Sequence, residues 1–212
     1  MSDRQATVFI IDNDNSLRES LQWLLESAGI VSAGFATGDA FLAAVDRTRA
    51  GCVLLDVRLP GMSGVVLQEA MQRAGLRLPV IVMTGFADVD TAVRMLKAGA
   101  FDFFEKPFAD QVLLERIEQA IAVDTTRRAA RARRDALASR LACLTARERE
   151  VFEQVVHGKP NKVVAYEFGI SEKTVEVHRA RVMHKLGATS LAELVRMDLL
   201  VQPVDSLRLL QG

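Results

Sequence analysis

Three polar residues have the types and positions that a phosphate-handling site requires. Asp56 and Thr84 each follow a short apolar run, and Lys106 precedes Pro107. The loops that leave the carboxyl ends of parallel strands converge on one crevice, so residues far apart in the sequence can share a site there. A carboxylate, a hydroxyl and an ammonium group in one crevice suit phosphoryl chemistry, because a transferring phosphoryl group spreads negative charge over its oxygens.

The apolar pattern of the first half predicts the elements that would position these residues. Short apolar runs alternate with helical patterns, which favours a five-stranded parallel α/β unit. Leu17, Leu21, Leu24 and Leu25 lie on one face of the first predicted helix, and Gly29 is expected just after its end. The strands are expected at 8–11, 30–31, 52–55, 80–83 and 101–104, and the later helices at 39–46, 64–73, 88–98 and 110–122.

Charge separates the chain into two halves. Residues 1–123 contain 11 Lys+Arg and 16 Asp+Glu, a net charge of −5, whereas the rest contains 16 and 11, a net charge of +5. We therefore expect an acidic module followed by a basic one, and the basic module hints at an anionic partner such as nucleic acid.

The two cysteines, Cys52 and Cys143, are too few for a disulfide framework and have no metal-ligand spacing. Cys52 lies in an apolar run and is expected to be a buried, reduced thiol. No apolar stretch approaches the ~20 residues that span a bilayer. The expectation is a soluble, cytoplasmic protein that does not bind membranes.

An Ala/Arg-rich segment follows the first module. Residues 124–140 lack Pro and Gly, which predicts a solvated helical linker between a domain at 5–123 and a second at 141–205. Direct contact of its arginines with DNA is a less favoured alternative.

The second module has an all-α pattern. Thr145 and Glu148 can form a capping box, and Asn161 and Ser171 are further N-cap candidates. The last predicted helix carries an apolar stripe that is either core or a dimer seam. The helices are expected at 146–157, 162–168, 172–186 and 190–201, and the stripe is Leu191, Leu194, Val195 and Leu199.

Four motifs in the first module resemble the receiver domain of bacterial response regulators, the CheY-like, flavodoxin-like fold. They are Ile11-Asp12-Asn13-Asp14, the segment 55–64 around Asp56, Met83-Thr84-Gly85 and Lys106-Pro107-Phe108. The resemblance implies that Asp56 accepts a phosphoryl group from a sensor histidine kinase, with Mg²⁺ beside it. It also implies that Thr84 contacts the phosphorylated aspartate, that Phe103 turns inward on activation, and that the Lys106–Pro107 bond is cis.

The predicted Mg²⁺ ligands are oxygen donors, as a hard cation prefers. They are Asp12, Asp56 and the main-chain carbonyl of Arg58, with Asn13 and Asp14 beside them. The family usually has an aspartate where this chain has Asn13, and asparagine keeps an oxygen but loses a charge. We therefore expect weakened Mg²⁺ affinity with phosphorylation retained, and Asp14 is expected to compensate in part.

The second module resembles the DNA-binding domain of the NarL/FixJ branch of LuxR-type regulators, closest to the FixJ type. The resemblance rests on Leu144-Thr145-x-Arg147-Glu148, Gly158-x-x-Asn161-Lys162, Ile170-Ser171-x-x-Thr174-Val175-x-x-His178 and Lys185-Leu186. It implies a helix-turn-helix whose second helix enters the major groove.

Side chains of that helix divide by expected role. Val175, Val182 and Leu186 should face the core. Phosphate contacts, which position the domain without reading sequence, are expected from Lys162, Lys173, Thr174, Arg181 and Lys185. Base contacts are expected from Glu176, Val177 and Ala180, whereas His178 could be packed, contact a phosphate or read a base.

The sequence thus predicts a transcription factor rather than an enzyme. Phosphorylation of Asp56 is expected to promote homodimerisation through residues 88–104 and binding to double-stranded promoter DNA, with RNA polymerase as a further partner and activation as the expected output. One alternative is a DNA-binding regulator whose receiver works without phosphate. Another is a haloacid-dehalogenase-type phosphatase, but Arg58 interrupts the Asp-x-Asp pattern of that class.

Overall fold

The computed structural model describes residues 5–85 and 89–201. The chain divides into two compact units, Met1–Arg128 and Ala129–Gly212. Within the described residues, no helix combines the length and the apolar character that crossing a membrane requires.

Five parallel strands form the centre of the first unit, in the order β2-β1-β3-β4-β5. This confirms the predicted α/β class with a parallel sheet. The strand expected at 30–31 instead begins at Val31 and runs to Phe35, and the one expected at 101–104 begins one residue later. The strands are β1 (Thr7–Ile11), β2 (Val31–Phe35), β3 (Gly51–Asp56), β4 (Val80–Thr84) and β5 (Asp102–Glu105).

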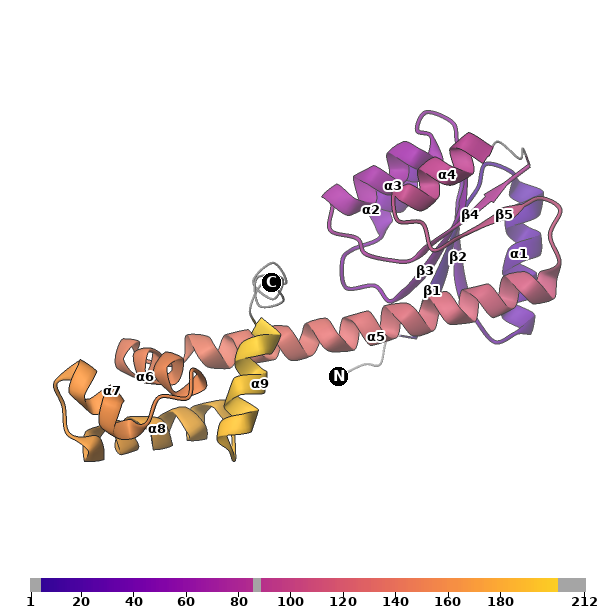
Figure 1. Ribbon diagram of the computed structural model, residues 1–212. Helices are drawn as coiled ribbons and strands as arrows, with labels where there is room; N and C mark the ends of the chain where they lie inside the picture. Colours follow the sequence, from indigo (N-terminus) through magenta and orange to yellow (C-terminus); the bar gives the residue numbers. More distant parts are fainter. Residues whose placement is uncertain (1–4, 86–88, 202–212) are drawn as a thin grey trace. The chain divides into compact units, whose positions relative to one another are not determined.

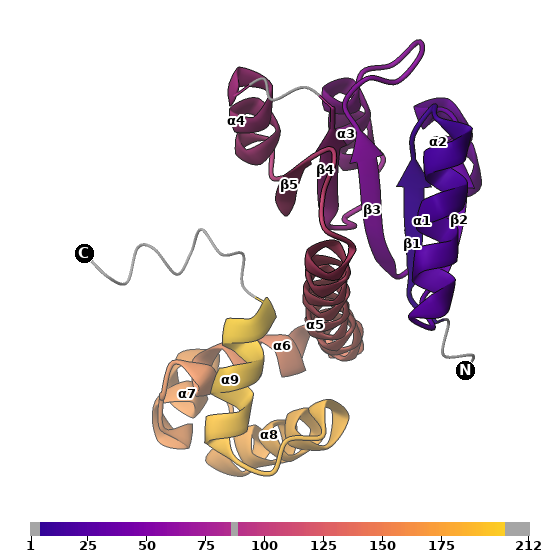
Figure 2. The ribbon, with the colours of Figure 1, turned by 90° about the vertical axis from the view of Figure 1, so that its right-hand side faces the viewer.

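Helices cover both faces of this sheet, as Figures 1 and 2 show. Alternation along β1 explains why two faces are needed, since Val8 and Ile10 join one buried cluster and Phe9 and Ile11 join the other. The first cluster packs against α1 and α5, and the second against α2, α3 and α4. These helices are α1 (Asn15–Ser27), α2 (Gly38–Ala44), α3 (Gly64–Arg73), α4 (Val89–Lys97) and α5 (Asp110–Ala142).

The start of β3 requires a glycine. Gly51 has φ +136°, and a Cβ atom built there would lie 1.8 Å from the carbonyl oxygen of Thr7. The close approach lets β3 begin directly beside β1, because Thr7 pairs with Gly51 in the sheet. Strand β3 then runs through a fully buried centre and ends at Asp56.

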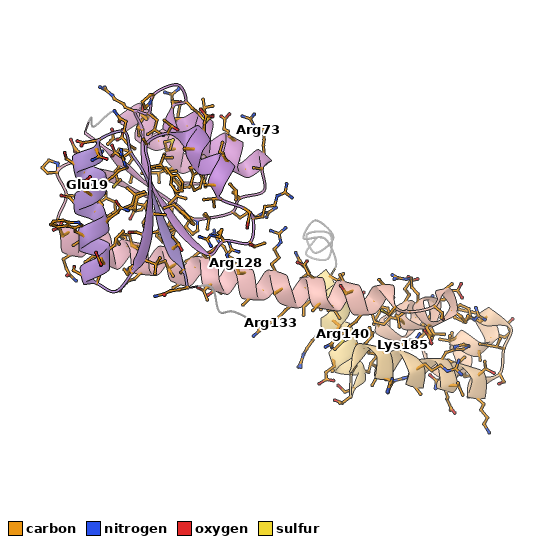
Figure 3. The ribbon with its side chains drawn as sticks, turned by 180° about the vertical axis from the view of Figure 1, so that it is seen from behind. Glu19, Arg73, Arg128, Arg133, Arg140 and Lys185 are labelled. Atoms are coloured by element: carbon orange, nitrogen blue, oxygen red, sulfur yellow. The ribbon has the colours of Figure 1, made fainter. Side chains whose placement is uncertain are left out.

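Helix α5 continues through the segment predicted as a linker. The expectation of a solvated segment is wrong at its beginning, because Asp124 is 3% exposed and its Oδ2 accepts a hydrogen bond of 2.9 Å from the Gly51 amide. Arg128 pairs with the same oxygen at 2.7 Å and also donates to the carbonyl oxygens of Thr48 and Arg49. Figure 3 shows Arg128 beside the loop that precedes β3. The first unit therefore includes residues 124–128.

The second unit is all-α, as predicted, and its core gathers side chains from every helix. The last turns of α5 contribute Leu137 and Leu141, while α8 contributes Val175, Val182 and Leu186, which confirms their predicted inward positions. The other helices are α6 (Ala146–Val156), α7 (Asn161–Phe168), α8 (Glu172–Leu186) and α9 (Leu191–Val201).

Two of the three predicted helix caps of this unit are confirmed. Thr145 and Glu148 form the capping box, and the Ser171 hydroxyl accepts from the Thr174 amide at 3.1 Å. Asn161 is not an N-cap: Pro160 occupies that position without a side-chain hydrogen bond, and Asn161 is the first residue of α7. The side-chain Oδ1 of Asn161 instead accepts a hydrogen bond of 3.2 Å from Arg179 of α8.

The apolar stripe of α9 is core only in part. Leu194 is fully buried and Val195 is half-buried, but Leu191 and Leu199 are exposed. The dimer-seam alternative for the exposed pair stays a prediction.

Candidate functional site

The strand order brings the predicted polar residues to one edge of the sheet. Asp12 follows β1, Asp56 ends β3, Thr84 ends β4, and Lys106 follows β5. These four strands are consecutive neighbours in the sheet, so their carboxyl ends lie side by side. The Lys106 amide donates to the carbonyl oxygen of Thr84 at 2.7 Å, and the Lys106–Pro107 bond is cis, as predicted.

One ammonium group joins two buried carboxylates at this edge. Lys106 Nζ lies 2.6 Å from Asp12 Oδ2 and 3.0 Å from Asp56 Oδ1. The remaining oxygens accept main-chain hydrogen bonds, Asp12 Oδ1 from Asp14 at 2.9 Å and Asp56 Oδ2 from Arg58 at 3.1 Å. Both aspartates are almost wholly buried. The carboxylates are therefore held in place before any phosphate arrives.

The environment shifts the pKa of both charged partners upward. Burial raises the pKa of Asp56 above its ordinary 3.8, although Lys106 opposes this shift by stabilising the carboxylate. For Lys106, burial favours the neutral amine, but the hydrogen bonds to Asp12 and Asp56 outweigh it and raise the pKa above 10.5. Lys106 therefore stays charged at neutral pH.

The neighbouring predicted metal ligands have different surroundings. Asp14 Oδ1 caps α1 by accepting from the amides of Ser16 and Leu17 at 2.9 and 3.2 Å. Asn13 is exposed. Arg18, which sequence reasoning missed, donates to the carbonyl oxygen of Asp12 and to the side chain of Asn15, both at 2.7 Å. Arg18 therefore holds together the loop that contains Asn13.

The donor set fits a hard divalent cation in chemical type. Asp12 and Asp56 provide carboxylate oxygens, Asn13 an amide oxygen and Arg58 a main-chain carbonyl, and Mg²⁺ prefers such ligands. Across residues 5–85 and 89–201, no group of three His, Cys, Asp or Glu side chains is arranged to hold a metal ion. Thr84 is 3% exposed, and Phe103 is half-buried and packs against the cluster on the α2–α4 side.

Helix α8 presents most of the predicted DNA-contacting residues to solvent. Lys173, Thr174, Glu176, Val177, Ala180 and Arg181 are exposed on α8, as is Lys162 on α7. His178 is half-buried, and its Nδ1 is buried without a hydrogen-bond partner in the described part of the chain.

Lys185, a predicted phosphate contact, is exposed on α8 and also makes an ion pair inside the second unit. Its ammonium nitrogen lies 2.6 Å from Glu148 Oε2, and Glu148 is 3% exposed. Sequence reasoning found Glu148 as a capping residue but not as the partner of Lys185, because the two stand 37 positions apart. Only the packing of α6 against α8 brings them together.

Comparison with known proteins agrees with both halves of this architecture. The response regulator receiver domain model matches residues 8–118, and the model for bacterial regulatory proteins of the luxR family matches residues 142–198. The chain belongs to the response regulators. It is a two-component response-regulator transcription factor of the FixJ/NarL type, with a receiver and a LuxR-type helix-turn-helix.

Relatives of this response regulator match along most of its length. The transcriptional regulatory protein FixJ of Azorhizobium caulinodans is 44% identical, over 93% of this chain and 95% of that protein. The C4-dicarboxylate transport transcriptional regulatory protein DctR of Rhodobacter capsulatus is 48% identical, over 90% and 98%. These relatives are transcriptional regulators rather than enzymes, which leaves the phosphatase alternative without support.

Solved structures of response regulators are also similar. That of the response regulator StyR shares 42% identity with a TM-score of 0.84, covering 91% of this chain and 98% of that one. Full-length FixJ from B. japonicum shares 42% identity with a TM-score of 0.57, covering 92% and 97%.

Proposed function

We propose that this response regulator is switched by transfer of a phosphoryl group from a sensor histidine kinase to Asp56. The observation that carries the proposal is the contact of Lys106 with both Asp12 and Asp56. It supplies a nucleophile, a fixed positive charge and an adjacent carboxylate in one water-poor site.

The residues have distinct roles in the transfer. An oxygen of Asp56 attacks phosphorus, and the bond between phosphorus and the imidazole nitrogen of the kinase breaks as the new bond forms. Lys106 then pairs with the phosphoryl oxygens, and the Thr84 hydroxyl donates a hydrogen bond to them. Mg²⁺, when bound, neutralises part of the negative charge on these oxygens. Asp12, Asp56, the Arg58 carbonyl and Asn13 would hold it, with Asp14 as a weaker contributor.

The output of the switch is proposed to be homodimerisation followed by binding to double-stranded promoter DNA. The pairing surface is α4 and β5, where Val93 and Leu96 are 40% and 47% exposed. Asp88, with which the predicted surface begins, lies outside the described residues. Phe103 turns inward as Thr84 moves toward the phosphate, which changes this surface.

A dimer places two α8 helices on the half-sites of one pseudo-palindrome. Lys162, Lys173, Thr174 and Arg181 contact phosphates, Glu176, Val177 and Ala180 face base edges, and His178 lies between these groups. The proposed result is activated transcription, with RNA polymerase as the downstream partner.

The test uses the full-length protein with Mg²⁺, before and after treatment with acetyl phosphate. Oligomeric state is measured by light scattering and DNA affinity by fluorescence anisotropy, with a duplex selected by the protein from a random pool. Asp56→Ala should abolish any gain, whereas Asp39→Ala, which removes an exposed carboxylate of α2, should retain it. A gain that survives Asp56→Ala would exclude Asp56 as the acceptor.

The use of Asp14 as a helix cap favours a second candidate function. With Asn13 uncharged and Asp14 Oδ1 bound to two amides, Asp12 and Asp56 remain the fixed carboxylates of the site. A receiver of this kind could act as a constitutive dimerisation module without phosphate. Equal dimerisation and DNA binding in every sample of the same experiment would favour this candidate.

A further inference from the structure

The carboxyl-terminal end of α8 is attached to the segment that connects α5 with α6. Lys185 Nζ donates to the Cys143 carbonyl oxygen at 3.2 Å as well as to Glu148 at 2.6 Å. Arg140, near the end of α5, donates to the carbonyl oxygen of Leu186 at 3.2 Å. Figure 3 shows Arg140 and Lys185 in this part of the second unit. Lys185 of α8 and Arg140 of α5 therefore each connect the last turn of α8 to the neighbouring segments.

Glu148 is the buried centre of these contacts. Its Oε2 accepts from both Lys185 and the amide of Thr145, at 2.6 and 2.9 Å. The hydrogen bond from Lys185, followed by the one from Thr145, lowers the pKa of Glu148 to about 2. The carboxylate is therefore charged at neutral pH, and it is 3% exposed. A charge in that position needs its ionic partner, because removal of one member leaves an uncompensated buried charge.

Packing around the ion pair supports the same attachment. Leu137 and Leu141 of α5 lie in one buried cluster with Val182 and Leu186 of α8. The carbonyl oxygen of Leu141 also accepts a hydrogen bond of 2.9 Å from Arg149 of α6. The end of α8 thus belongs to a junction with α5 and α6, whereas its earlier turns carry the exposed residues from Lys173 to Arg181.

We infer that Lys185 acts in DNA binding as a positioning residue, through Glu148 and the Cys143 carbonyl, and not as a phosphate contact. This inference rests on the proposed DNA-binding function of α8. The Lys185 ammonium is already bonded to two acceptors, Glu148 Oε2 and the Cys143 carbonyl oxygen, and a phosphate that replaced Glu148 would leave this buried carboxylate with the Thr145 amide as its side-chain donor among the described residues. Lys173 has no such constraint, because it is exposed and makes no ion pair within the described residues. Lys185 and Glu148 fix the angle at which α8 meets the groove.

Salt dependence separates a positioning residue from a phosphate contact. Each phosphate contact contributes about −0.9 to the slope of log K against log salt concentration, so loss of one contact makes the slope shallower by that amount. Full-length wild type, Lys185→Met and Lys173→Met are compared on the selected duplex and on a scrambled duplex. We expect Lys173→Met to reduce the slope by about 0.9. We expect Lys185→Met to weaken binding to the selected duplex at every salt concentration with the slope unchanged.

Glu148→Gln gives an independent measurement that does not depend on Lys185→Met remaining folded. Glutamine retains the capping box but removes the charge. Electrostatics alone predicts that loss of a negative charge strengthens DNA binding, whereas loss of the positioning contact weakens it. Circular dichroism melts of each variant establish that the helices are intact at the assay temperature. We expect weaker binding by Glu148→Gln, with a slope equal to that of wild type.

Two results would overturn the inference. One is a reduction of the slope by Lys185→Met equal to that caused by Lys173→Met. The other is DNA binding by folded Glu148→Gln that is equal to or tighter than that of wild type. Failure of the wild type to prefer the selected duplex over the scrambled one would instead contradict the proposed function, so the two failures are distinguishable.

Discussion

The Lys106 ammonium donates a hydrogen bond of 3.0 Å to the same carboxylate, Asp56, that is proposed to receive the phosphoryl group. The nucleophile and the cation that would stabilise the product are thus already paired in this structure. Phosphorylation exchanges a carboxylate partner for a phosphoryl partner, so the positive charge need not move far between the two states. This relationship determines how the site should respond to pH, to metal and to substitution.

Substitution of Asn13 by aspartate should strengthen Mg²⁺ binding. The side chain is exposed and stands where the family usually carries a carboxylate, so Asn13→Asp adds a full charge to the oxygen ligands. We expect roughly tenfold tighter binding, about 1.4 kcal/mol. Asn15→Asp is the matched control, because it adds a charge two positions away, at the first residue of α1, whose side chain bonds Arg18 and Glu19. Mg²⁺ titration by calorimetry measures both, and equal affinities for the two variants would contradict the assignment of Asn13 as a ligand.

The raised pKa of Asp56 predicts loss of phosphorylation in mild acid. Burial raises this pKa above 3.8, so Asp56 gains a proton at a higher pH than an ordinary aspartate does. In the window between 3.8 and the raised value, the folded state binds more protons than the unfolded state, and stability falls as pH rises. Labelling with acetyl phosphate across this pH window measures the loss of phosphorylation, and urea unfolding measures the change in stability. Asp56→Asn should remove this part of the pH dependence of stability. If the stability of the variant depends on pH as that of wild type does, Asp56 is not the group responsible.

The charge of Lys106 should stabilise the folded protein up to alkaline pH and then stop doing so. Its pKa is raised above 10.5, so its stabilising contribution is complete below the unfolded value and is lost as pH rises through the folded value. Urea unfolding of wild type and Lys106→Met should therefore differ most below pH 10.5 and converge above it. A constant difference across the alkaline range would exclude the charge of Lys106 as the cause.

Arg128 should stabilise the first unit more than its neighbour Arg127 does. Arg128→Met leaves the buried carboxylate of Asp124 without its ionic partner, for which the expected cost is about 3 kcal/mol. Arg127→Met changes an exposed side chain without an ion pair in the described chain, so we expect a change within about 0.5 kcal/mol. Urea unfolding followed by circular dichroism provides the comparison. Equal stabilities of the two variants would show that Asp124 does not need Arg128.

Gly51 should tolerate no side chain. A Cβ atom there would lie 1.8 Å from the Thr7 carbonyl oxygen, so Gly51→Ala must separate β3 from β1. We expect a loss of about 3 kcal/mol or more. Gly29→Ala is the control, because Gly29 also has positive φ but has open space around it, and only the backbone strain of about 1 kcal/mol should appear. Thermal unfolding of both variants measures how much more stability Gly51→Ala loses than Gly29→Ala. Equal losses would show that the contact with Thr7 relaxes, and would contradict the prediction.

Local patterns in the sequence were enough for the strands, most helix ends and the edge of the sheet where Asp12, Asp56 and Lys106 meet. Gly29 at the end of α1 and Ser171 at the start of α8 were found because each acts on its immediate neighbours. Apart from the local hydrogen bonds of Arg18, the missed contacts join distant segments. Asp124 was assigned to a solvated linker because an aspartate in an Ala/Arg-rich helix carries no sign of a partner at Gly51.

Contacts between distant segments also explain why the surroundings of Lys185 and Asn161 in the second unit were not predicted. Lys185 was interpreted as a phosphate contact because it is a lysine on the recognition helix, and its pairing with Glu148 depends on how α6 packs on α8. Asn161 has a residue type favoured at N-caps, but Pro160 takes that position and Asn161 bonds Arg179 instead. Residue type therefore identified the candidates, while tertiary packing determined which neighbours each one contacts.

The shared helix α5 has a practical consequence for building chimaeric regulators. Its Asp124 and Arg128 are bonded into the receiver, and its Leu137 and Leu141 are buried in the core of the second unit, but residues 129–133 are exposed throughout. A fusion point inside 129–133 would leave both hydrophobic cores complete. A cut after residue 123 would remove Asp124 and Arg128 from one partner, and a cut at residue 140 would remove Leu137 from the other. The place for exchanging sensing and output modules is therefore the middle of a helix, not a loop.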